Sequence, residues 1–326
     1  MKLTRQSATR ALLAGLLAGI AGLAAAQEYP NKPIKLLVPY ATGGTPDVVA
    51  RFQANMLTAT LGQPITVENK PGAGGLPAVQ ELMRSAPDGY TFMIADVGQY
   101  AIVPAMRPGV YDPIKDLQPL VQTMTNSVFL MSNTSIPVNN MKDLIALIKA
   151  NPGKYSYGSP GVGTIHHLFM EATKVAYGLD VQHVPFKGSS QTIISLLNGD
   201  VAMCICGVTT TQQQIKEGKI KVFAASTKER DMKLAPDVPS ATEFGAPDLD
   251  FAAPSGYFAP AGTPRPIVEK LSAALAKAAQ SPEFAARAPA LGTIVEYRNT
   301  AQFTEVVHSA YPRYVRVVKL AGIKPQ

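Results

Sequence analysis

Short apolar segments rich in β-branched residues alternate with helical patterns along most of this 326-residue chain. The segments with strand character are Ile34 to Val38, Ile65 to Glu68, Thr91 to Ala95, Val128 to Met131, Tyr155 to Gly158, Val181 to Pro185, Val201 to Ile205 and Val222 to Ala225. Strands that alternate with helices are typical of parallel sheets in an α/β fold. The pattern therefore predicts an α/β protein, and the length suggests about two domains.

Three helices can be placed from their periodicity. Thr45-Pro46-Asp47 predicts a helix start with Thr45 as the N-cap, proline at the first position and an acid in the first turn. A second helix is expected from Met141 to Ile148, and a third is expected around the apolar stripe of Ile193, Ile194 and Leu197.

The first 26 residues have the pattern of a secretory signal peptide. Three basic residues and no acid precede the 16-residue apolar run Ala11 to Ala26, which is shorter than the ~20 residues that a membrane-spanning helix needs. We therefore expect cleavage near Ala26 and export to the periplasm as a soluble protein. Removal of the three basic residues lowers the formal net charge from +7 to +4. No Lys or Arg cluster remains that would indicate nucleic-acid binding.

The two cysteines, Cys204 and Cys206, lie two residues apart in an apolar run. On a strand they would share a face, but their Cβ atoms would be too far apart for a disulfide. Two sulfurs without further ligands nearby do not make a zinc site. We interpret both residues as packing residues.

Three loops of small residues each join a predicted strand to a helix start. They are Ala41 to Pro46, Gly158 to Thr164 and Lys187 to Ser190. Glycine lets a ligand approach the main chain closely, and the free N–H groups of a first helical turn attract anions. No loop has the spacing or the lysine of a polyphosphate site, so neutral donors of this kind favour a carboxylate.

Catalytic and metal-binding patterns are missing from the sequence. Neither G-x-S-x-G nor H-E-x-x-H occurs, and the adjacent His166 and His167 would point about 100° apart on a helix. We predict no catalytic residue, no metal and no cofactor. Asp96 lies near a predicted loop, and the sequence does not assign it a role.

Ordered motifs through nearly the whole mature chain resemble one known family. These motifs are Tyr29 to Ile34, Val38 to Gly44, Leu61 to Gly75, Ala86 to Thr91, Tyr111 to Asp116, His183 to Gly188, Ala259 to Pro264 and Ala321 to Pro325. They resemble the Bug receptors, the periplasmic binding proteins of tripartite tricarboxylate transporters.

The resemblance implies a two-domain periplasmic binding protein fold of the type II kind, a Venus flytrap with the ligand cleft between the domains. Domain I is expected at residues 27–125 plus about 251–326, and domain II at about 126–250. Family ligands are mostly small carboxylates, which include tricarboxylates, aliphatic or aromatic dicarboxylates and acidic amino acids. The implied partners are this ligand and the membrane subunits of a transporter, with a monomeric receptor. A receptor for a membrane sensor kinase is the alternative, and a periplasmic enzyme is a less favoured one.

The resemblance also implies the ligand-binding residues. They come from the first domain's loop, the segment after Ala95, the second domain's loop and the end of the strand at residue 206: Tyr40, Ala41, Thr42, Gly43, Gly98, Gln99, Ser159, Gly163, Thr164, His167, Cys206 and Gly207.

Two departures from the family pattern bear on the ligand. Thr45 and Pro46 replace the family's usual glycine and threonine, and Pro46 removes one N–H donor. Cys206 stands where many members carry an aspartate suited to an ammonium group. We therefore expect that aspartate and glutamate are not ligands, and that Cys206 borders an apolar or aromatic part of the ligand.

Overall fold

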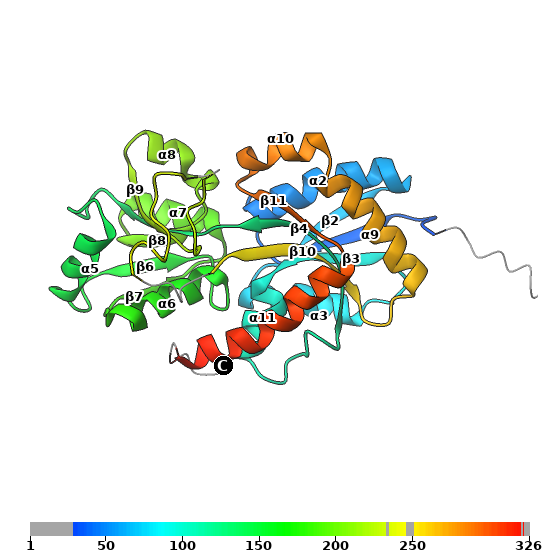
Figure 1. Cartoon of the computed structure of the whole chain (residues 1–326), viewed down its shortest axis with the longest axis horizontal. Helices are drawn as coiled ribbons and strands as arrows, with labels where there is room; N and C mark the ends of the chain where they lie inside the picture. The colour runs from blue at the N-terminus through cyan, green and yellow to red at the C-terminus, as the bar shows by residue number, and fades with distance from the viewer. Residues whose placement is uncertain (1–28, 233–234, 246–250, 321, 323–326) are drawn as a thin grey trace, which may run out of the picture.

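The computed structural model describes residues 29–232, 235–245, 251–320 and 322. The predicted signal peptide lies outside these residues. The chain forms two lobes, each built on its own β-sheet, and β4 and β10 run side by side between them (Figure 1). In the described residues, no helix has the length and hydropathy of a bilayer-spanning segment.

The first lobe contains a six-stranded sheet in the order β11-β4-β10-β3-β1-β2. Its strands are β1 (Ile34–Val38), β2 (Ile65–Asn69), β3 (Thr91–Asp96), β4 (Leu117–Asn126), β10 (Ala253–Pro260) and β11 (Ile294–Arg298). Its helical segments are α2 (Thr45–Leu61), η1 (Ala73–Gly75), α3 (Leu76–Arg84), η2 (Gly98–Ile102), α4 (Val103–Met106), α9 (Arg265–Ala279), α10 (Pro282–Leu291) and α11 (Thr300–Leu320).

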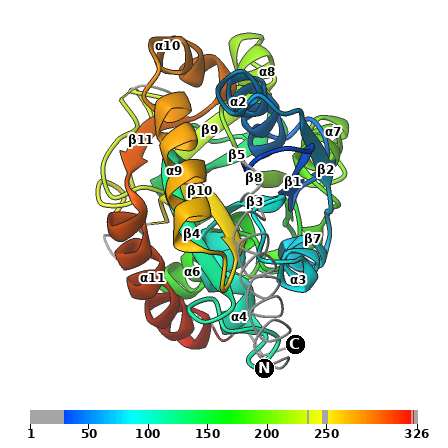
Figure 2. The same ribbon diagram turned by 90° about the vertical axis from the view of Figure 1, so that its right-hand side faces the viewer.

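Alternation along β1 divides the core of this lobe between the two faces of the sheet. Leu36 packs with side chains of α2, α9 and α10, whereas Leu37 packs with side chains of α3 on the other face. Figure 2 shows α2 and α3 on opposite sides of β1 and β3. Because successive side chains of a strand point to opposite faces, the run Ile34–Val38, which is apolar apart from Lys35, requires helices on both sides.

The second lobe contains a five-stranded sheet in the order β7-β6-β8-β5-β9. Its strands are β5 (Phe129–Asn133), β6 (Ser156–Ser159), β7 (Gln182–Pro185), β8 (Met203–Cys206) and β9 (Ile220–Ala225). Its helical segments are α5 (Met141–Lys149), α6 (Ile165–Tyr177), α7 (Ser189–Asn198), η3 (Thr209–Thr211) and α8 (Gln212–Lys216).

The prediction of parallel sheets was wrong, because both sheets are mixed. β10 is antiparallel to β3 and β4, β11 is antiparallel to β4, and β5 is antiparallel to β8 and β9. The physical reason lies in the connection between the lobes. β4 carries the chain out of the first lobe and β10 brings it back, so two paired strands that cross the same junction must run in opposite directions.

The third predicted apolar stripe is only partly buried. Within α7, Ile193 is 7% exposed, whereas Ile194 is 57% and Leu197 is 38% exposed. Leu196, which is fully buried, completes the inward face with Ile193.

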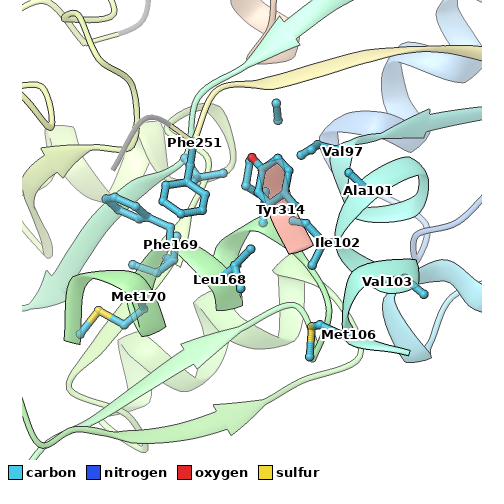
Figure 3. Packing of buried hydrophobic residues seen from close by; sticks show 14 of the residues in the cluster. Val97, Ala101, Ile102, Val103, Met106, Leu168, Phe169, Met170, Phe251 and Tyr314 are labelled. Carbon is cyan, nitrogen blue, oxygen red and sulfur yellow. The ribbon is translucent and has the colours of Figure 1, made fainter. Parts of the chain in front are cut away.

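Helix α11 packs against both lobes at the junction. The ring of Tyr314 lies 6.0 Å from that of Phe251, and Phe251 lies 5.8 Å from Phe169 of α6. Figure 3 shows these three rings together with Leu168 and residues of η2. This apolar cluster holds the C-terminal helix against the junction between the two lobes.

Gly256 in β10 tests the packing at the junction. A Cβ on this residue would meet the carbonyl oxygen of Val121 and lie 2.7 Å from the ring of Phe303, so we expect Gly256→Ala to lower the free energy of unfolding by about 1–3 kcal/mol. Urea denaturation would measure the loss. Gly207→Ala is the control, because its Cβ would meet nothing closer than 3.9 Å. Equal stabilities of the two variants would contradict this account.

Candidate ligand-binding site

A cavity of about 260 Å³ lies between the two lobes. Its wall in the first lobe consists of the loops after β1 and β3 and includes Tyr40, Ala41, Thr42, Gly44, Thr45 and Asp96. Its wall in the second lobe consists of the loops after β6, β7 and β8 and includes Ile165, His166, Gly188, Ser189, Ser190 and Gly207. The crossings contribute Asn126, Ser127, Val128 and Ala253.

The first-lobe wall contains the N-terminus of α2. The helix begins at Thr45 with Gly44 as the N-cap, so the prediction of Thr45 as the cap was wrong by one residue. Asp47 braces the loop in front of the helix, because its Oδ2 accepts a hydrogen bond from the Gly43 amide at 2.9 Å. Gly44, Thr45 and Pro46 at this helix start line the cavity. No side chain caps α2, so the N–H groups of its first turn, apart from the one that proline lacks, have no side-chain acceptor.

The second-lobe wall contains the N-terminus of α7. Gly188 is the N-cap, with φ at 141°, and no side chain caps this helix either. Ser189 and Ser190 begin the helix and line the cavity. Two uncapped helix N-termini therefore meet the same cavity from opposite lobes, and both carry partial positive charge.

The lobes approach each other closely at the edge of the cavity. A Cβ placed on Gly188 would lie 3.0 Å from Cβ of Ala41, and one on Gly43 would lie 4.0 Å from Oγ of Ser190. Near Gly207, a Cβ would lie 3.9 Å from Oγ1 of Thr45. These approaches across the gap describe a closed arrangement in which glycine is needed at residue 188.

His166 is the imidazole in the cavity wall. Its Nδ1 atom is shielded from solvent and has no hydrogen-bond partner among the described residues. Burial lowers the pKa of His166 to about 4, so the ring is neutral at pH 7. A buried N–H without a partner is less favourable than a buried lone pair, so we assign the proton to Nε2. His166 is then a neutral donor.

His167 points elsewhere and does not line the cavity. Its ring stacks on His183 with centroids 4.4 Å apart, and His183 stacks on Tyr157 at 4.7 Å. Oγ of Ser159 lies 2.7 Å from Nε2 of His183, and Ser159 is fully buried. This set of contacts holds the loop after β6 from behind.

Asp96 and Tyr40 form a hydrogen-bonded pair in the first-lobe wall. The Tyr40 hydroxyl donates to Oδ2 of Asp96 at 2.6 Å, and the Gly98 amide donates to Oδ1 at 2.7 Å. Burial raises the pKa of the Asp96 carboxyl above its ordinary value, while both hydrogen bonds oppose this shift. Gln99 supports the pair, because its Nε2 donates to the Tyr40 oxygen at 3.3 Å and to the Gly74 carbonyl at 2.8 Å.

The predicted ligand-binding residues divide into two groups in the structure. Tyr40, Ala41, Thr42 and Gly207 line the cavity, whereas the following residues do not: Gly43, Gly98, Gln99, Ser159, Gly163, Thr164, His167 and Cys206. Several of the second group hold the loops from behind, as Thr164 does by donating to the Gly161 carbonyl at 2.7 Å.

Cys206 belongs to the buried core of the second lobe, where both cysteines are free thiols. No three His, Cys, Asp or Glu side chains gather as a metal site would in the described part of the chain.

Sequence reasoning did not assign several cavity residues to the ligand. Ser189 and Ser190 belong to a small-residue loop that the sequence already singled out. Asp96 opens the segment after Ala95 that the family resemblance linked to the ligand, whereas the sequence did not distinguish His166 from its neighbour His167. The direction of a side chain on α6, and the position of a carboxylate at the end of β3, depend on how each element packs.

An α/β protein with two lobes, and with a cavity between them that two helix N-termini line, has the architecture of a periplasmic solute-binding protein. The tripartite tricarboxylate transporter receptor family model matches residues 49–323, and the chain belongs to this family. The resemblance to the Bug receptors and the expected fold class are confirmed.

Known relatives and structures match almost the full length. A UPF0065 protein of Bordetella pertussis is 35% identical over 86% of this chain and 85% of its own, and the protein BugT of the same organism is 30% identical over 94% of each. The solved structure of the periplasmic binding protein BugD is 31% identical with a TM-score of 0.85, and covers 91% of this chain and 100% of BugD. MatC from Rhodopseudomonas palustris, with bound malate, is 30% identical with a TM-score of 0.83, and covers 89% of this chain and 100% of MatC.

His166 also predicts how stability depends on pH. Its pKa is about 4 in the folded protein, whereas in the unfolded chain it titrates near the usual value of about 6.5. Between these values the unfolded chain binds more protons, so the free energy of unfolding falls as the pH falls from about 6.5 toward 4. We expect His166→Gln to remove about 1–2 kcal/mol of this fall, measured by urea denaturation at pH 7.5 and pH 4.5.

A remaining pH dependence is expected in the variant, because burial also lowers the pKa of His183, to about 3. His308→Gln on the exposed face of α11 is the matched control for a histidine-to-glutamine replacement. If His166→Gln behaves like the control, the neutral buried state assigned to His166 is wrong.

Proposed function

We propose that this protein captures a small carboxylate in the cavity between its lobes and delivers it to the membrane subunits of a tripartite tricarboxylate transporter. The observation that carries the proposal is the pair of uncapped helix N-termini, those of α2 and α7, which face one closed cavity. Free amides and serine and threonine hydroxyls are suited to a carboxylate.

Two solved relatives support the ligand class. One is MatC, whose structure contains malate. The other is Rpa4515 from R. palustris with adipate, which is 28% identical with a TM-score of 0.85, and covers 92% of this chain and 100% of that protein. We infer that the cavity of this chain holds a carboxylate of similar size, with Tyr40, Ala41, Thr42 and Gly207 among its contacts.

We infer binding without turnover. Ser159 and His183 have the spacing of a nucleophile and its base, but Ser159 is fully buried and lies outside the cavity wall. A bound ligand would have no access to its hydroxyl. The pair is better explained as support for the loop after β6.

We propose that domain I comprises residues 27–125 and about 251–326, and that domain II comprises about 126–250. The sheet topology supports this division, because β4 and β10 belong to the first sheet, whereas β5 and β9 belong to the second. The domains would close over the ligand by rotation about the two crossings. We also propose that residues 1–26 direct export to the periplasm, where the receptor acts as a monomer.

The first experiment is a thermal-shift screen of the mature protein, unfolded and refolded to remove any ligand bound during expression. The panel contains succinate, malate, aspartate, glutarate, adipate, citrate, benzoate and phosphate. A ligand at 100 times its Kd should stabilise the protein by about 2.7 kcal/mol. We expect at least one carboxylate to raise the Tm and phosphate to have no effect. A response to phosphate alone, or to no member of the panel, would contradict the proposal.

Closure predicts a specific effect at Gly188. Gly188→Ala would strain a φ of 141° and press the new Cβ against Ala41 of the other lobe. Gly161→Ala is a matched control, because its φ is 140° but its Cβ would contact only the second lobe, 3.4 Å from the Phe186 carbonyl oxygen. Both variants should lose similar stability, whereas Gly188→Ala should bind the best carboxylate of the screen about tenfold more weakly in calorimetric titration. Equal affinities of the two variants would rule out this role for Gly188.

A further inference from the structure

A negatively charged side chain lies in the wall of a cavity that otherwise suits an anion. Asp96 ends β3, is 6% exposed and lines the cavity beside Tyr40. This arrangement is unexpected, because an ionised carboxylate repels a bound carboxylate, and the repulsion is strong away from water.

Hydrogen bonds around Asp96 show that its carboxyl group is the acceptor in the pair with Tyr40. The Gln99 amide has a defined orientation, since its Oε1 accepts from the Asp96 amide at 3.1 Å and its Nε2 donates to the Gly74 carbonyl at 2.8 Å. The same Nε2 donates to the Tyr40 oxygen. The Tyr40 proton is therefore directed to Asp96, and the Asp96 oxygens accept from both Tyr40 and Gly98.

Each carboxylate oxygen retains acceptor capacity after these contacts. An ionised carboxylate can accept about four hydrogen bonds. Asp96 accepts two, one from the Gly98 amide and one from the Tyr40 hydroxyl. Across the described ranges, no lysine, arginine or histidine forms an ion pair with it. A buried charge without a counterion is costly unless a partner is provided.

The cavity is the side from which a partner can come. We propose that Asp96 is a specificity-determining residue that accepts a hydrogen bond from the ligand, and that the ligand is a small carboxylate with an ammonium or hydroxyl substituent. This inference rests on the proposed function, since the carboxylate end of the ligand is assigned to the N-termini of α2 and α7. Asp96 then selects the substituent.

The inference reverses the expectation drawn from Cys206. That expectation excluded amino-acid ligands because an acidic residue is missing at the end of β8, yet Cys206 lies in the second-lobe core and does not reach the cavity wall. Asp96 supplies an acidic group from the opposite lobe. The charge needed for an ammonium group is thus present at another position.

Calorimetric titration of the refolded mature protein tests the inference with acids of one carbon skeleton. Succinate, malate and aspartate differ only in a hydrogen, hydroxyl or ammonium substituent, and glutarate, 2-hydroxyglutarate and glutamate repeat the comparison one carbon longer. We expect a substituted acid to bind at least tenfold more tightly than the unsubstituted acid of its series. The preferred substituent distinguishes a hydroxy acid from an amino acid as the ligand.

The variant Asp96→Asn keeps the size of the side chain and removes its charge. We expect the affinity for an ammonium-bearing ligand to fall about tenfold to a hundredfold, and that for the unsubstituted acid to stay the same or rise. A hydroxyl-bearing ligand should lose less, because an amide oxygen still accepts a hydrogen bond. Asp200→Asn, at an exposed position beyond the C-terminus of α7, is the matched control and should change no affinity.

The outcomes separate this inference from the function on which it rests. If carboxylates bind but the unsubstituted acids bind as tightly as the substituted ones, the role of Asp96 is refuted while the proposed function stands. A loss of affinity in Asp96→Asn that is equal for all ligands also refutes it. If no carboxylate binds at all, the proposed function fails and the inference fails with it. The comparison on the unmodified protein remains decisive if the variant does not fold.

Discussion

The antiparallel pairing of β4 with β10 is the constraint on which the cavity depends. The two strands pair from Leu117 with Pro260 to Asn126 with Ala253. The pairing of the outgoing and returning chains therefore ends at Asn126 and Ala253, which line the cavity. Two hydrogen-bonded crossings join the lobes more firmly than a single strand would. Helix α11 adds apolar contacts behind this ladder through Phe251 and Tyr314. The loops that face the cavity are therefore presented by two lobes in a defined orientation.

Polar groups behind the cavity wall form hydrogen bonds with one another, whereas the helix N-termini in the wall have no side-chain cap. Asp47 takes the Gly43 amide and the side chain of Asn69, which leaves the first turn of α2 without an internal partner. In the second lobe, Ser159 and His183 satisfy each other, and Thr164 caps its own loop. Buried polar groups that lack partners destabilise a fold, and these bonds satisfy several of the polar groups that lie behind the cavity wall. His166 adds a neutral donor to the cavity wall because burial keeps its ring uncharged.

Sequence patterns identified the elements that bury a regular apolar face and missed those that do not. β1 was predicted at its observed bounds, since Ile34–Val38 is a continuous apolar and β-branched run apart from Lys35. β4 and β10 were missed because they contain Gln122, Thr125, Pro254 and Gly256, which reduce the strand signal. Such residues are tolerated in the paired strands that cross between the lobes. For α7 the pattern predicted the helix but not its buried face, because Ile194 and Leu197 follow the helical period yet remain exposed.

The sequence by itself determined the α/β class, the family and the loops of small residues from which an anion site could be built, because these depend on local periodicity and on motifs that are contiguous in the chain. Only the tertiary structure decided which side chains meet at the cavity. His166 and His167 are adjacent in sequence, yet one lines the cavity and the other stacks on His183, since neighbouring residues on a helix point in different directions. Asp96 lines the cavity, whereas Cys206, which the sequence placed at the ligand, lies in the core of the second lobe. The packing of each strand end, and not its composition, sets which side chain faces the cavity.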